Sequence, residues 1–216
     1  MTKIITDKPI AVDSLDHMHP YGVLNDNNSA FQYIMEVKNY FKNNKISVLD
    51  LGCAGGQIIV DHHNLDDFSV GLEGSSNVLQ GAGKHNWEQY YNKNLFLCDI
   101  TEPFTCLQDS NETINFDYIQ MWEVLEHIPE NKLSILLKNI ANHLSNDGLF
   151  CGSIATYVCP SGTHVSIFNK DKWKQIFKDN GFELTEYIFK TLPRQDLLPH
   201  LIPNYQNGFV FTAKKL

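Results

Sequence analysis

The chain places two carboxylates and two imidazoles where they could act on one reacting group. Glu123, Glu126 and His127 stand at positions i, i+3 and i+4, so on a helical turn their side chains would share one face. His164 follows the next apolar run, whose end we expect to open into the same crevice. The four side chains are candidate ligands for Mg²⁺, Mn²⁺ or Zn²⁺. Glu123, His127 and His164 are also candidate catalytic residues, because an imidazole can take the proton of a hydroxyl group.

A glycine-rich stretch at residues 48–56 has the composition of a cofactor site. An apolar run there contains Asp50 near its end and is followed by Gly52, Gly55 and Gly56. Glycine lets the backbone approach a ligand where a side chain would collide, and a helix N-terminus normally follows such a turn. The spacing is Gly-x-x-Gly-Gly and not the Gly-x-Gly-x-x-Gly of dinucleotide sites. The stretch therefore predicts a nucleotide-like cofactor other than NAD, and a plain tight turn is the structural alternative.

Two further acids follow the next two apolar runs. Glu73 comes roughly 20 residues after the glycine-rich turn, where a carboxylate can accept hydrogen bonds from both ribose hydroxyls. Asp99 follows the third run. Parallel strands open into one crevice at their carboxyl ends, so the acids should face the same ligand. Each acid could instead cap a helix or a turn.

This series of motifs resembles that of the class I S-adenosylmethionine-dependent methyltransferases, over roughly residues 46–190 and the last strand. The resemblance implies that the glycine-rich turn and Asp50 surround the methionine part and the ribose of S-adenosylmethionine. It also implies that Asp99 binds the adenine amino group and that Ile100 lies near the ring. The residues expected to contact the cofactor are Asp50, Gly52, Cys53, Ala54, Gly55, Gly56, Glu73, Gly74, Asp99, Ile100 and Trp122.

The Glu-x-x-Glu-His pattern is similar to the metal site of the small-RNA 2′-O-methyltransferases. It is also similar to ubiquinone-pathway O-methyltransferases, which carry Gly-Thr-His in the region of His164. The same pattern followed by proline is common in methyltransferases without a metal, where the histidine is structural or lines the substrate pocket. A metal site and a metal-free substrate pocket both remain open at this point.

The N-terminal region has its own motif, His-Pro-Tyr-Gly at residues 19–22, followed by Asn-Asp-Asn-Asn at residues 25–28. It resembles elements that precede the core in a group of bacterial and viral methyltransferases often assigned to glycan or small-molecule modification. Tyr21 stands where that group has Trp. The resemblance implies a segment that folds over the cofactor, and a simple Pro-Gly turn is the alternative.

The alternation of apolar runs and helical patterns predicts an α/β fold with a Rossmann-like, doubly wound, seven-stranded sheet that is mostly parallel and has an antiparallel C-terminal edge strand. The expected strands are residues 46–51, 69–72, 95–98, 116–121, 149–154, 182–189 and 208–214. The expected helices are residues 31–43, 131–144, which ends before Asn-Asp-Gly, and 170–180, which Gly181 caps. We expect one domain, with a cap and first helix at 1–45 and the methyltransferase core at 46–216. Residues 191–207 are either part of a substrate lid or an ordinary loop.

Composition narrows the classes of function. The 216 residues carry a formal charge of −8, which disfavours a wide nucleic-acid surface. No apolar run approaches the roughly 20 residues that cross a bilayer, and charges interrupt the N-terminus, so we expect no membrane association, no signal peptide and a cytoplasmic location. The lysines at 170, 172, 174 and 178 alternate with aspartates and predict a solvated helix face.

The remaining histidines and the cysteines have simpler expected roles. The five cysteines are odd in number and lack a Cys-x-x-Cys pair, which indicates reduced thiols used as small core residues. The seven histidines outside the candidate site, His62 and His63 among them, are expected at the surface.

The leading hypothesis is an S-adenosylmethionine-dependent methyltransferase that methylates a hydroxyl of a sugar or other small molecule. One alternative is an RNA 2′-O-methyltransferase with a divalent metal, which the acidic charge opposes. The other is an inactive cofactor-binding partner subunit, which the intact acids of the crevice oppose.

Overall fold

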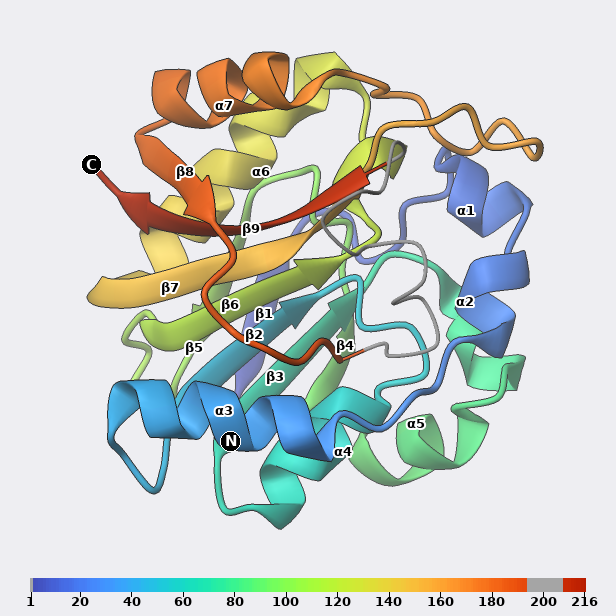
Figure 1. Ribbon diagram of the computed structural model, residues 1–216. Helices are drawn as coiled ribbons and strands as arrows, with labels where there is room; N and C mark the ends of the chain where they lie inside the picture. The colour runs from blue at the N-terminus through green and yellow to red at the C-terminus, as the bar shows by residue number, and fades with distance from the viewer. Residues whose placement is uncertain (1, 194–207) are drawn as a thin grey trace.

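A seven-stranded sheet forms the centre of the computed structural model, which describes residues 2–193 and 208–216 (Figure 1). The strands lie in the order β4-β3-β2-β6-β7-β9-β8. Their bounds are β2 Ser47–Leu51, β3 Phe68–Glu73, β4 Leu95–Leu97, β6 Phe116–Trp122, β7 Leu144–Ala155, β8 Phe182–Glu186 and β9 Gly208–Lys215. The first five strands in this order are parallel, and β9 is antiparallel to both of its neighbours. The predicted fold class is confirmed, and the antiparallel strand lies one position inside the outermost strand, β8.

Helices cover both faces of the sheet. Their bounds are α3 Phe31–Phe41, α4 Gln57–Asn64, α5 Lys84–Tyr90, α6 Glu130–His143 and α7 Lys170–Asp179. Side chains of α6 and α7 share one apolar cluster with the central strands, whereas α3 packs in a second cluster and α4 and α5 in a third. Figure 1 shows α6 and α7 above the sheet and α3 and α4 below it. Because both faces are covered, the central strands are continuous apolar runs in the sequence.

The strand order reverses between β2 and β6. These two strands are neighbours although β3 and β4 separate them along the chain. The helix after β2 is α4 and the helix after β6 is α6, and the two lie on opposite faces of the sheet (Figure 1). In open α/β sheets, ligands bind at the carboxyl ends of the strands at such a switch point. We therefore expect a ligand site at the carboxyl ends of β2 and β6.

The N-terminal region contains elements that the sequence did not predict. Strand β1 (Lys3–Thr6) pairs antiparallel with β5 (Phe104–Leu107), and two short helices follow, α1 (Leu15–Met18) and α2 (Tyr21–Asn25). Helices of four and five residues are not stable alone, so contacts with the rest of the protein must hold them. Figure 1 shows both on the side of the molecule toward which the parallel strands run.

Several predicted boundaries differ from the structure. Helix α6 ends at His143, and β7 begins at Leu144 because Leu144 pairs with Phe116. The Asn-Asp-Gly triplet after it therefore continues the strand, where a turn was expected. Strand β8 ends at Glu186 and not at residue 189. Gly181, at φ +83°, follows α7 in the left-handed conformation that suits a residue after a helix end, as predicted.

The expectation that the other histidines lie at the surface is wrong for two of them. His62 and His143 are fully buried. His62 Nδ1 lies 2.9 Å from a carboxylate oxygen of Asp67. His143 Nδ1 donates to the carbonyl of Asn139 at 2.7 Å, and its Nε2 accepts from the N–H of Cys106 at 3.0 Å. Three of their four ring nitrogens have a polar partner inside the core, and Nε2 of His62 has none among the described residues, so polarity alone was a poor guide to exposure.

The cysteines and most of the lysines near α7 lie as their patterns predicted. All five cysteines are free thiols, and all but Cys159 are buried. Three of the four lysines near α7 are exposed, on the side opposite Trp173 and Phe177, and Lys170 is half-buried. In the described ranges, none of the helices has the length and apolar character needed to span a membrane. The stretch 194–207, which holds most of the predicted substrate lid, lies outside the described residues.

Candidate active site

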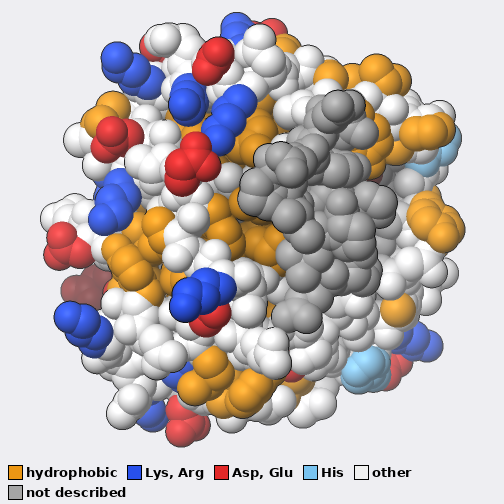
Figure 2. All heavy atoms as spheres, in the orientation of Figure 1, with side chains coloured by type: hydrophobic (Ala, Val, Ile, Leu, Met, Phe, Trp, Pro, Cys, Tyr) orange, Lys and Arg blue, Asp and Glu red, His pale blue; other side chains and the backbone are white. Residues whose placement is uncertain are grey.

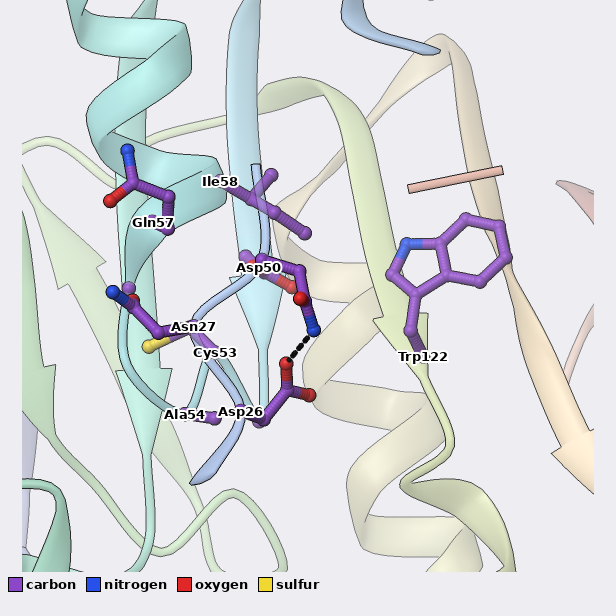
Figure 3. Close-up of a pocket in the computed structure, with 11 residues that line it drawn as sticks. Asp26, Asn27, Asp50, Cys53, Ala54, Gln57, Ile58 and Trp122 are labelled. Atoms are coloured by element: carbon purple, nitrogen blue, oxygen red, sulfur yellow. Dashed lines mark hydrogen bonds between the residues drawn. The ribbon is translucent and has the colours of Figure 1, made fainter. Parts of the chain in front are cut away.

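A pocket opens at the carboxyl ends of β2 and β6. Asp50 of β2 lines it together with Trp122, the last residue of β6 (Figure 3). Asp50 is buried, and this burial raises the pKa of its carboxyl to about 7, with a further contribution from the charges of Asp26 and Glu73. A buried carboxylate at this position favours a ligand that brings positive charge or hydrogen-bond donors.

The turn after β2 needs glycine for two physical reasons. Gly52 and Gly56 have φ values of +79° and +78°, which side chains disfavour. A Cβ on Gly52 would lie 2.6 Å from a methyl carbon of Val124, and a Cβ on Gly55 would lie 2.4 Å from Oδ1 of Asn27. The turn thus lies against the segment after β6 on one side and the N-terminal segment on the other.

Glu73, at the end of β3, bonds back to the turn. One carboxylate oxygen accepts the N–H of Ala54 at 3.0 Å, and the other accepts the N–H of Ser75 at 2.9 Å. Burial raises the pKa of Glu73 to about 7. Each carboxylate oxygen has a second lone pair, so the side chain retains acceptor capacity for the hydroxyls of a ligand.

The third acid also has a local structural role. Oδ1 of Asp99 accepts hydrogen bonds from the N–H and hydroxyl of Thr101 at 3.0 and 2.7 Å, which is the turn-capping alternative. Its other oxygen has no hydrogen bond within the described part of the chain, and Ile100 beside it is buried. The N-terminal segment closes this end of the crevice, because the N–H of Asp99 donates to the carbonyl of Lys8 and the N–H of Ala11 donates to the carbonyl of Gly74.

The N-terminal segment also forms one wall of the pocket. The N–H of Gly55 donates to the carbonyl of Asp26 at 2.9 Å, and Asn86 donates to the side-chain oxygen of Asn27 at 3.1 Å. Figure 3 shows Asp26 and Asn27 facing the turn, with the amide of Asn28 hydrogen-bonded to Asp26. Residues of the pocket that the sequence did not single out as cofactor contacts are Asp26, Asn27, Asn28, Gln57 and Ile58. Asp26, Asn27 and Asn28 belong to the Asn-Asp-Asn-Asn motif, which could have indicated them from the sequence.

In the segments that follow β6 and β7, the structure brings Glu126, His127 and His164 together. One ring nitrogen of each histidine and one carboxylate oxygen of Glu126 lie within 4.8 Å of one another. The centroids of the two imidazole rings are also 4.8 Å apart. The expected helical turn is wrong for Glu123, because only Leu125–His127 forms a single 3-10 turn and Glu123 precedes it with φ +55°. Glu123 is not part of this group of candidate ligand atoms.

Glu126 is poorly satisfied for a buried carboxyl group. Its Oε1 accepts the N–H of Ala155 at 3.2 Å, and its buried Oε2 has no hydrogen-bond partner among the described residues. Burial and the neighbouring charge of Glu123 raise the pKa of Glu126 well above its usual range. An unpartnered buried oxygen points to a missing donor, cation or proton.

His164 is held in one tautomer. Its Nδ1 lies 3.0 Å from the carbonyl oxygen of Tyr157, which can only accept, so Nδ1 carries the proton. Burial and the nearby His127 lower the pKa of His164 below its usual value. The neutral ring therefore keeps a lone pair on Nε2, which suits either a base or a metal ligand.

The strand order defines an open, doubly wound α/β fold with a pocket at its switch point. The comparison with protein families is more specific, since residues 27–187 match the model of the methyltransferase domain. The chain therefore belongs to the methyltransferase-domain family.

Known proteins agree with this assignment. A structure described as an S-adenosylmethionine-dependent methyltransferase from Clostridium acetobutylicum superposes with a TM-score of 0.63 at 14% identity, covering 92% of this chain and 97% of the other. The mitochondrial ubiquinone biosynthesis O-methyltransferase of Candida albicans is 29% identical over 68% of this chain and 42% of its own length. The ubiquinone biosynthesis O-methyltransferase of Glaesserella parasuis is 34% identical over 47% of this chain and 42% of its own length. The chain thus spans about two-fifths of the length of these curated relatives.

Proposed function

We propose that this methyltransferase uses S-adenosylmethionine to methylate a hydroxyl group of a small molecule. The observation that carries the proposal is the pocket formed by Asp50, the glycine-rich turn and Trp122, together with the pair of imidazoles on the segment after β6 and on the segment after β7; Gly52 of the turn packs against Val124, three residues before His127. The names of the two ubiquinone-pathway relatives support an oxygen atom as the acceptor, and the solved neighbour supports the cofactor.

In the proposed complex, the pocket holds the methionine part of the cofactor. S-adenosylmethionine carries a sulfonium and an ammonium group, and the carboxylates of Asp50 and Asp26 are the charges that would stabilise them. Glu73 would accept the ribose hydroxyls, while Asp99 and Ile100 would bind the adenine. Gly74 is half-buried and in contact with Ala11, so it would let the N-terminal segment approach the cofactor.

The transfer itself is an in-line displacement, in which the acceptor oxygen bonds to the methyl carbon as the sulfur–carbon bond breaks. The acceptor loses its hydroxyl proton in this reaction. Nε2 of His164 is placed to take that proton, because Nδ1 is already bonded to the carbonyl of Tyr157. The products are the methyl ether, S-adenosylhomocysteine and a protonated histidine, which returns its proton to water.

The same group of residues fits a divalent cation. The donor set of Glu126, His127 and His164 contains two imidazoles and a carboxylate, and Oε2 of Glu126 has no other partner among the described residues. A cation bound there would act as a Lewis acid that lowers the pKa of the acceptor hydroxyl. Glu123 would act from outside the group, through its charge on Glu126.

We further propose that residues 1–45 act as a cap on the core at 46–216. The bonds from Ala11 to Gly74 and from Gly55 to Asp26 support this division, since they attach the N-terminal segment along the whole cofactor pocket. A cytoplasmic location remains part of the proposal.

Among acceptors, a sugar or another small molecule is favoured over RNA. The formal charge is −8, and on the face shown in Figure 2 the basic side chains are interspersed with acidic ones. A phosphate backbone binds to continuous basic surface, and this distribution does not provide it on that face.

The test begins with calorimetry of the purified protein with S-adenosylmethionine, S-adenosylhomocysteine and NAD. We expect low-micromolar or tighter affinity for the first two and none for NAD. Formation of S-adenosylhomocysteine is then followed with catechols, other phenols, sugars and an oligoribonucleotide as acceptors. Turnover with a small hydroxyl compound supports the proposal. Turnover only with the oligoribonucleotide, or binding of NAD alone, would contradict it.

A further inference from the structure

A carboxylate from the N-terminal segment reaches the imidazole pair. Oδ2 of Asp16, in α1, lies 2.9 Å from Nδ1 of His127, which follows β6. The two side chains are 33% and 15% exposed, so the contact is partly shielded from water. Asp16 is far from His127 in the sequence, and neither residue type nor spacing had indicated a contact between them.

The position of α1 is fixed by bonds on the opposite side of the crevice. The carbonyl of His17 accepts a hydrogen bond from the side chain of Asn77 at 3.0 Å, and Nδ1 of His17 lies 3.4 Å from the hydroxyl of Ser75. Ser14 accepts the N–H of Asp16 at 3.2 Å and so caps the helix. The short helix therefore bridges the loop after β3, on the ribose side, and His127, on the acceptor side.

The electrostatic influence of Asp16 extends to both sides of the crevice. Its negative charge contributes to the raised pKa values of Glu73 and of Glu126, and it opposes the lowering of the pKa of His164. Asp16 thus lies near the centre of the site, because its charge acts on Glu73, which we assign to the ribose, and on Glu126 and His164. It is not an ordinary surface charge.

We propose that Asp16 is a positioning residue for His127. It keeps a proton on Nδ1, so that Nε2 carries the lone pair that contacts the acceptor or a cation. In this conformation no acceptor among the described residues is aligned with Nδ1 for a hydrogen bond, so the contact is a close approach of the carboxylate to the ring nitrogen. Closure of α1 onto bound cofactor would align it, because active-site hydrogen bonds commonly tighten when the ligands bind. The catalytic arrangement is then complete only when the N-terminal segment is docked.

This inference rests on the proposed function for its kinetic part, so its first test needs no acceptor. In ¹⁵N-labelled protein saturated with S-adenosylhomocysteine, the ring nitrogens of His127 report its tautomer, and the signals are assigned with His127→Gln. We expect the Nδ1–H form in the wild type. In Asp16→Ala we expect a shift toward the Nε2–H form, whereas Asp13→Asn, an exposed neighbour in the same segment, should leave the spectrum unchanged.

The kinetic part uses an accepted hydroxyl substrate. Asp16→Asn should lower kcat about 10- to 100-fold, the usual effect of losing the partner of a functional histidine, with little change in cofactor affinity. Asp16→Glu should recover part of the rate. An unchanged His127 tautomer in Asp16→Ala overturns the proposal. A loss of cofactor affinity large enough to account for the whole kinetic effect also overturns the proposal. In that case Asp16 would serve to hold α1 in place and would not position His127. Failure of every acceptor would count against the proposed function and leave the tautomer test valid.

Discussion

The carboxylate of Glu73 holds the backbone of Ala54 across the crevice, with its Oε2 accepting the Ala54 N–H at 3.0 Å. Ala54 has φ +44°, a conformation that costs energy for a residue with a Cβ. The indole N–H of Trp87 donates to the carbonyl of the same residue at 2.9 Å. The acid that we assign to the ribose therefore also fixes the shape of the glycine-rich turn, and the two parts of the cofactor site form one unit.

The first prediction concerns cofactor affinity. Asp50→Ala and Glu73→Ala should each weaken binding of S-adenosylmethionine by at least about 1.4 kcal/mol, a tenfold loss in affinity. Asp50 would lose its charge beside the methionine part, and Glu73 would lose both the ribose contacts and the bond to Ala54. Calorimetry measures both effects. Glu88→Ala is the matched control, because Glu88 is exposed and pairs with Lys84 on the surface of α5. Wild-type affinity in both crevice variants would refute the site.

The second prediction concerns pH. Burial raises the pKa of Asp50 and of Glu73 to about 7, so below that pH each carboxyl is mostly protonated in the free protein. The positive cofactor favours the ionised forms, so affinity should increase as pH rises from about 6 to about 8, and binding near pH 7 should release protons. Calorimetry in buffers of different ionisation enthalpy counts these protons. Asp50→Asn should reduce the number released, and a pH-independent affinity would contradict the assignment.

The same shifts have a consequence for stability without cofactor. A carboxyl whose pKa is higher in the folded than in the unfolded protein binds more protons when folded. These two carboxyl groups therefore contribute to the stability of the folded state below about pH 4. Their contribution is lost as pH rises through about 7. The acids that we assign to the cofactor thus destabilise the empty site at neutral pH.

The third prediction concerns the contact between the turn and the N-terminal segment. In Gly55→Ala the new Cβ would lie 2.6 Å from the carbonyl oxygen of Asp26, so one backbone must move. Overpacking of this kind costs about 1–3 kcal/mol, and here it displaces a wall of the pocket. We expect a folded protein with weaker cofactor binding. Gly22→Ala is the control, since nothing lies within 4 Å of its Cβ position. Equal affinities for both variants would show that the N-terminal segment is not part of the site.

The fold and the glycine-rich turn that lines the pocket were largely predictable because they depend on local patterns. A fully covered parallel sheet produces continuous apolar strands, and the turn at Gly52 and Gly56 requires positive φ, so both leave clear signals. The contact of Asp16 with His127 left none, since it depends on how α1 docks. Glu123 lies outside the group of candidate ligand atoms for a related reason. Its backbone turns at φ +55°, and helical spacing does not describe where its side chain lies.

The fourth prediction concerns the buried ion pair beneath α4. Nζ of Lys38 donates to Asp67 at 2.8 Å, and the other carboxylate oxygen lies 2.9 Å from Nδ1 of His62. Asp67→Asn leaves the buried ammonium without its counter-charge and should lower the free energy of unfolding by about 3 kcal/mol or more. Chemical denaturation measures this loss. Asp66→Asn should change it by less than about 0.5 kcal/mol, because Asp66 is exposed. Similar values for the two variants would mean that the pair adds no stability.

The last prediction separates catalysis from binding. His164→Asn removes the Nε2 lone pair that we assign as proton acceptor, while His164 belongs to the acceptor side and not to the cofactor pocket. We expect kcat to fall by about 100- to 10,000-fold with cofactor affinity unchanged, because general-base catalysis contributes a factor of this size. His85→Asn, which alters an exposed histidine, should match the wild type in both measurements. If His164→Asn retains its rate when divalent cations are removed by chelation, then neither the base nor the metal ligand role holds. The acceptor would have to lose its proton to a group outside the imidazole pair.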